Sequence, residues 1–60
     1  MTSFIAIDLT NGDVAHVNPA MVRFIEHNAN IPDECDIYFA DDHKISAKGG
    51  ARDVAKKLGV

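Results

Sequence analysis

A basic, glycine-containing run near the C-terminus holds the residues best suited to binding chemistry. The run reads Lys48-Gly49-Gly50-Ala51-Arg52 and follows Ser46 closely. Glycines let a backbone approach a ligand, and a helix that begins here offers free amides and the positive end of its dipole to an anion. The run therefore predicts a site for a phosphate-bearing, nucleotide-like ligand held by Ser46, Lys48, Gly49, Gly50 and Arg52. It lacks the spacing of a P-loop, so the alternative is a plain strand-to-helix turn with solvated basic side chains.

Tyr38 is a candidate contact for a ligand or a partner. Neighbouring residues of a strand face opposite ways, so Tyr38 and Phe39 cannot both enter one small core. If Phe39 is interior, together with Ile37 and Ile45, then Tyr38 points outward, where its ring can stack on a base or anchor an interface. The alternative is an exposed tyrosine without a role.

The remaining reactive side chains do not form a recognisable catalytic or metal-binding pattern. Side chains of the types that ligate zinc occur at His16, His27, Cys35, Asp41-Asp42 and His43, but no pair has finger or HExxH spacing. Cys35 and His43 have the side chains of a nucleophile and a base, yet so short a chain has little material for a closed pocket and an orienting third group. We expect no metal, no cofactor and no enzymatic activity.

Length and composition predict one small globular domain spanning 1–60. The 60 residues are 47% hydrophobic and 25% charged, which is typical of a folded chain, and the single cysteine excludes an intrachain disulfide. No apolar run approaches the roughly 20 residues of a membrane span, and no secretory signal opens the chain, so we expect a cytoplasmic protein without a membrane partner. Because domains below roughly 70–80 residues usually need a staple or a partner, we expect a homo-oligomer, by default a dimer.

Charge is divided unevenly along the chain. Residues 1–43 hold eight of the nine acidic residues and only Arg23 among the basic ones, whereas residues 44–60 hold five basic residues and Asp53. Such asymmetry favours either a contact between copies or an anionic partner for the basic end. The net charge of −3 argues against a generally basic nucleic-acid binder.

Turn residues divide the chain into short strands. Residues 4–9 alternate and are followed by Asn11-Gly12, the strongest local signal for a hairpin, with residues 14–17 as the returning strand. A two-residue turn would pair Leu9 with Val14, and a bulged turn would shift the register by one. Asn18-Pro19 is compatible with a helix that runs through Met21, Val22 and Ile25. The β-branched and aromatic residues that follow favour instead one helical turn that feeds a strand over 22–27.

The second half predicts another hairpin and a helix. Strands are expected over 36–40 and 44–46, joined by a turn at Asp41-Asp42. The spacing of Ala47, Ala51, Val54, Ala55 and Leu58 favours an amphipathic helix that Gly59 ends. The expected fold class is α+β: a small, mostly antiparallel β-sheet or partly open barrel of about five short strands with one C-terminal helix.

Several short motifs resemble the FlbD/SwrD family of small flagellar and swarming-motility proteins. They are Leu9-Thr10-Asn11-Gly12-Asp13, Val17-Asn18-Pro19, Ile25-Glu26 and Asp53-Val54-Ala55. The resemblance, which spans most of the chain, implies a compact, mostly-β fold with a terminal helix, no catalytic residues and regulation through contacts with other macromolecules. The basic run from Ser46 to Arg52 departs from the acidic helix start expected in that family.

Three functions follow as hypotheses. The first is a homo-oligomeric binding protein that sequesters a phosphate-bearing ligand, in the manner of bacteriophage inhibitors of host defence. The second is a regulatory adaptor of the FlbD/SwrD type that contacts a host regulatory protein. The third is a nucleic-acid-binding module that contacts backbone phosphates with Lys44, Lys48, Arg52, Lys56 and Lys57.

Overall fold

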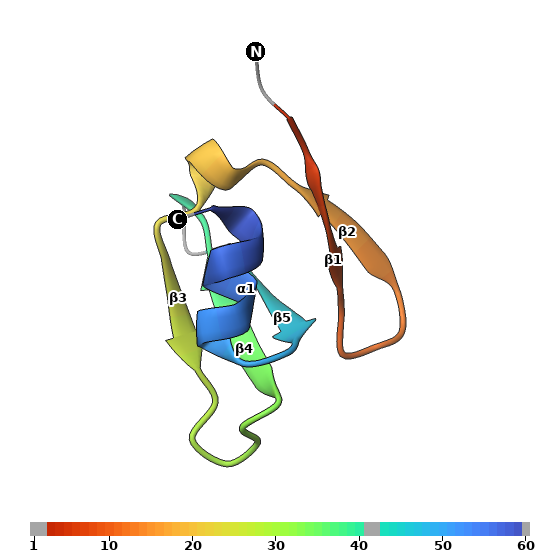
Figure 1. The fold of residues 1–60 in the computed structure, drawn as a ribbon, viewed down its shortest axis with the longest axis vertical. Helices are drawn as coiled ribbons and strands as arrows, with labels where there is room; N and C mark the ends of the chain where they lie inside the picture. Colours follow the sequence, from red (N-terminus) through yellow and green to blue (C-terminus); the bar gives the residue numbers. More distant parts are fainter. Residues whose placement is uncertain (1–2, 41–42, 60) are drawn as a thin grey trace.

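The chain folds into two antiparallel sheets followed by one helix (Figure 1). The computed structural model describes residues 3–40 and 43–59. Its elements in chain order are β1 (Ile5–Asp8), β2 (Val14–Val17), the 3₁₀-helix η1 (Pro19–Met21), β3 (Phe24–His27), β4 (Glu34–Tyr38), β5 (Lys44–Lys48) and α1 (Ala51–Leu58). The predicted α+β class, with five short strands and a C-terminal helix, is confirmed. Within the described residues the sheets do not close into a barrel.

The first hairpin adopts the shifted register. Asp8 lies opposite Val14, and the Leu9 N–H donates to the Asp13 carbonyl. The loop therefore contains three residues and ends at Gly12, whose positive φ of 93° suits glycine. As a result Ala15 and Val17 face the core, whereas the His16 side chain is exposed.

Local capping explains the start of the second sheet. The Asn18 side chain accepts a hydrogen bond from the Ala20 N–H, and Pro19 opens η1, as the sequence predicts. Strand β3 begins at Phe24 rather than at Val22, because the Arg23 N–H donates off-register to the Tyr38 carbonyl and regular pairing starts only after it.

The first strand of the second hairpin lies earlier in the sequence than expected. β4 covers 34–38 instead of 36–40, because a turn closed by the Glu34 N–H and the Ile31 carbonyl leads directly into the strand. Beyond Tyr38 the Phe39 N–H already bonds to the His43 carbonyl across the connection. The turn predicted at Asp41-Asp42 lies outside the described residues.

Helix α1 begins at Ala51, so the expectation that Ala47 belongs to the helical stripe is wrong. Ala47 pairs with Cys35 in the sheet, and β5 continues to Lys48 rather than ending at Ser46. Gly49, with φ of 105°, turns the chain, and Gly50 precedes the first helical residue. Gly59, in the left-handed region, ends the helix as predicted. In the described part of the chain, no helix combines the length and apolar character that crossing a membrane requires.

One core is shared by both sheets and the helix. Its buried members are Ile7, Val17, Cys35, Ile37, Ala47, Val54 and Leu58. Helix α1 covers the inner face of the sheet β3–β4–β5, and the hairpin β1–β2 joins this sheet through a bridge between Leu9 and Ala47 (Figure 1). Burial raises the pKa of the Cys35 thiol, and the neighbouring Asp36 carboxylate adds to the rise.

Candidate functional site

The side of the sheet β3–β4–β5 that faces away from α1 carries almost all of its polar side chains; we call it the outer face. Side chains alternate along each strand, and the register aligns them in rows across the three strands. Phe24, Tyr38 and Lys44 form one row, and Glu26, Asp36 and Ser46 form the next. Glu34 and Lys48 follow on β4 and β5. The strands thus position eight side chains on one open surface.

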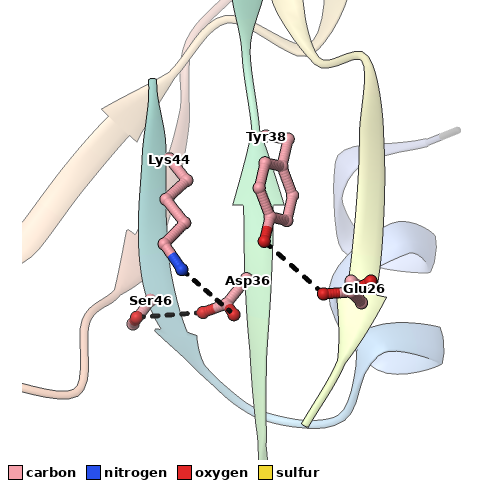
Figure 2. A network of polar contacts seen from close by, with 5 residues as sticks. All are labelled: Glu26, Asp36, Tyr38, Lys44 and Ser46. Atoms are coloured by element: carbon pink, nitrogen blue, oxygen red, sulfur yellow. Dashed lines mark hydrogen bonds and ion pairs between the residues drawn. The ribbon is translucent and has the colours of Figure 1, made fainter. Parts of the chain in front are cut away.

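An aromatic pair occupies one end of the outer face. The rings of Phe24 and Tyr38 stack with centroids 4.3 Å apart and an angle of 14° between their planes. The Lys44 ammonium lies 5.7 Å from the centroid of the Tyr38 ring, and the Tyr38 hydroxyl donates a long hydrogen bond of 3.4 Å to Glu26 Oε1 (Figure 2). Three neighbours on two strands therefore hold Tyr38 in place. Phe24 still exposes 48% of its surface.

Asp36 links the central strand to β5. Its carboxylate accepts a hydrogen bond of 3.0 Å from the Ser46 hydroxyl and lies 3.9 Å from Lys44 Nζ (Figure 2). Because the ion pair is partly exposed, its contribution to stability is at most about 1 kcal/mol. Its main effect is to orient Lys44 along the face, beside the Tyr38 ring.

The turn between β5 and α1, where the sequence predicts an anion site, contains Gly49 and Gly50 and leads to Asp53. The Gly49 N–H donates to the Asp33 carbonyl, so this amide is not free for a ligand. A Cβ on Gly50 would lie 3.5 Å from the Pro32 carbonyl oxygen and 3.9 Å from the Asp53 carboxylate. Asp53 lies in the first turn of the helix, and the N-cap residue, Gly50, makes no side-chain capping hydrogen bond. An acidic side chain therefore already lies at the positive end of the helix dipole.

The structure divides the predicted ligand-binding residues into two groups. Tyr38, Ser46 and Lys48 belong to the outer face. Gly49 and Gly50 form the turn that leaves this face, and Arg52 follows on α1, which covers the opposite side of the sheet. Tyr38 points outward and Phe39 packs against the core, as the sequence predicts.

Sequence reasoning missed Phe24, Glu26 and Asp36 as members of the site. The alternation of residues 24–27 places Phe24 and Glu26 on one face of a strand, and this signal was available. The stack on Tyr38 depends on the register in which β3 pairs with β4, and the residues of the connection 28–33 do not specify this register.

Cys35 and His43, which the sequence offered as a nucleophile and a base, have different environments. Cys35 is 1% exposed in the core, where burial raises the pKa of its thiol and favours the protonated form. His43 packs its ring against Phe39, with centroids 5.8 Å apart. Both line an open groove of about 300 Å³, whose other walls are Ala15, His16, Val17, Asn18, Met21 and Ile45. Among the described residues, no three or more His, Cys, Asp or Glu side chains gather where they could hold a metal ion.

No protein-family model, curated protein or solved structure matches this chain. The resemblance to the FlbD/SwrD family therefore stays a prediction based on its short motifs.

Proposed function

We propose that this chain is a small, non-catalytic interaction module that binds another protein through the outer face. The observation that carries the proposal is the stacked Phe24–Tyr38 pair, in which Phe24 exposes 48% of its surface among otherwise polar side chains. Exposed aromatic side chains beside polar groups are typical of the residues that dominate protein–protein binding energy.

The open shape of the outer face and the contacts that hold Tyr38 in place support a protein as the binding partner. The face is an open sheet surface, whereas sites for small molecules are concave and bury most of the ligand. Tyr38 is held by Phe24, Lys44 and Glu26 before any partner arrives, so binding would lose little additional side-chain entropy. The resemblance to FlbD/SwrD proteins implies the same class of function, a regulatory contact with another macromolecule.

The proposal is tested by cross-linking from defined positions. A photo-reactive phenylalanine analogue at position 24 is expected to form discrete protein adducts in cells of the source organism, and Tyr38→Ala in the same chain is expected to remove most of them. The matched control carries the probe at position 56, on the exposed side of α1. Equal adduct patterns from the two positions, or persistence after Tyr38→Ala, would contradict the proposal.

An anion-binding role is a second candidate, and the helix start favours it. The N–H groups of Ala51, Arg52 and Asp53 precede the first intrahelical bond, which Val54 makes, and the N-cap residue Gly50 has no side chain to cap them. Arg52 lies in the first turn of this helix, and Lys48 precedes the N-cap residue Gly50 by two positions. In this role the chain would sequester a nucleotide-like ligand, as an inhibitor of host defence does, or would contact nucleic-acid phosphates. The Asp53 carboxylate opposes such binding.

This second candidate predicts a ligand-dependent rise in thermal stability. A nucleotide at about a hundred times its dissociation constant would stabilise the native state by about 2.7 kcal/mol. Lys48→Ala and Arg52→Ala are expected to remove the shift, and Lys57→Ala, near the other end of the helix, is expected to retain it. Differential scanning fluorimetry with adenosine triphosphate and with inorganic phosphate measures the effect. No shift with either probe would eliminate this candidate.

A further inference from the structure

Charges on the outer face are segregated by strand. The acidic side chains Glu26, Glu34 and Asp36 lie on β3 and β4, and the lysines Lys44 and Lys48 lie on β5. β3 and β5 form the two sides of this sheet, with β4 between them. The outer face therefore has an acidic side and a basic side.

A surface with this arrangement complements itself. When a second copy is rotated by 180° about an axis parallel to β4 and faces the first, its β3 lies over β5 of the first copy, and the reverse contact forms by symmetry. Two sheets that pack face to face keep their strand directions within about 30° of each other. At such a small angle β3 of each copy stays over β5 of the other.

The register specifies which side chains would meet. Glu26 shares its row with Ser46, so the Glu26 of the second copy would lie over Ser46 of the first. Lys44 and Lys48 flank Ser46 on the same face, each about 7 Å away along the strand at two residues of about 3.4 Å. One carboxylate would thus be placed between two lysines, twice in the complex.

The aromatic row would form the apolar part of the contact. The Phe24 of the second copy would lie over Lys44, and the two Tyr38 rings would meet near the axis. Glu34, on the same strand as Asp36, would approach its own symmetry equivalent near the axis, with Lys48 opposite it in the register of each copy. Asp36 also lies near the axis, where it would approach its own symmetry equivalent. Its charge is already compensated by Lys44 and its hydrogen bond from Ser46, which reduces the repulsion.

We propose that the outer face binds a second copy of this chain in a two-fold symmetric, face-to-face dimer. The inference rests on the proposed function, because it names the protein partner of the same surface. Three strands of four to five residues present a small area compared with the roughly 1,200–2,000 Å² of stable interfaces, so the dimer is weak and depends on concentration.

A charge swap tests the proposal. Sedimentation equilibrium from micromolar to millimolar concentration is expected to show a monomer–dimer equilibrium for the natural chain. Glu26→Lys places like charges together at both contacts, and Lys48→Glu removes one attraction at each, so each variant alone is expected to dimerise about tenfold more weakly. An equimolar mixture of the two variants is expected to recover association, because the new positive charge at position 26 of one chain then faces the new negative charge at position 48 of the other.

Controls separate this inference from the proposed function. Lys56→Glu, on the exposed side of α1, is expected to leave the equilibrium unchanged, and far-UV circular dichroism checks that each variant folds. A natural chain that stays monomeric at millimolar concentration, or a mixture that associates no better than its components, overturns the dimer. Adducts to a different protein from position 24 alongside a monomeric natural chain would support the proposed function and reject the dimer.

Discussion

Replacement of Ile37 by alanine is expected to remove most of the stability of this chain. Ile37 lies at the centre of β4 with 0% of its surface exposed, between Ile25 and Ile45 in the same row. Truncation of a buried isoleucine to alanine costs about 2–5 kcal/mol. A 60-residue domain has a total stability of only about 3–9 kcal/mol. Urea denaturation followed by far-UV circular dichroism should therefore show a large fall in the midpoint, or a chain that is partly unfolded in buffer.

The control for this prediction is Val14→Ala. Val14 lies on β2 with 53% of its surface exposed, so its truncation is expected to change the free energy of unfolding by less than about 0.5 kcal/mol. Similar losses from both substitutions would contradict the placement of Ile37 at the centre of the core.

Replacement of Gly49 by alanine is the second substitution with a large expected effect. Gly49 has φ of 105°, and a Cβ there would also lie 3.5 Å from Val54 Cγ2. A non-glycine residue in such a conformation costs about 1–3 kcal/mol. Because this residue turns the chain from β5 into α1, the strain would be relieved only by moving the helix relative to the sheet. The same denaturation experiment measures the loss.

Gly50→Ala is the matched control for the turn. Gly50 has φ of −66° and ψ of 154°, which any residue adopts, and its Cβ would make ordinary contact with the Pro32 carbonyl oxygen. The reduced entropy of the unfolded chain then offsets the slightly poorer helix start, and the net change is expected to stay within about 0.5 kcal/mol. If Gly50→Ala destabilised the chain as much as Gly49→Ala, the conformation assigned to Gly49 would be wrong.

The features of the fold that sequence predicted correctly are those with local causes. Asn11-Gly12 marks a turn, Asn18 caps η1, and Gly59 ends the helix, and each acts within a few residues of itself. Ala47 shows where local reasoning fails. Its spacing to Ala51 suits a helix, but its pairing with Cys35 places it in β5, and small apolar residues are compatible with both.

The candidate site shows the same limit. Strand alternation places Tyr38 and Phe39 on opposite faces, and the prediction that Tyr38 points outward if Phe39 is interior is confirmed. Its stack on Phe24 and the division between Lys48 and Arg52 depend on the pairing of β3 with β4 and on the turn at Gly49. The pairing of strands and the direction of this turn are set by contacts in the folded chain, and local residue patterns do not specify them.

The bridge between Leu9 and Ala47 has a consequence for how this chain folds. It joins residues from opposite ends of the sequence, whereas each hairpin pairs near neighbours. Closing a long loop carries a greater entropic cost than closing a short one, and contacts distant in sequence slow folding. We therefore expect the local pairing within each hairpin to form early and the assembly of the two halves to limit the folding rate.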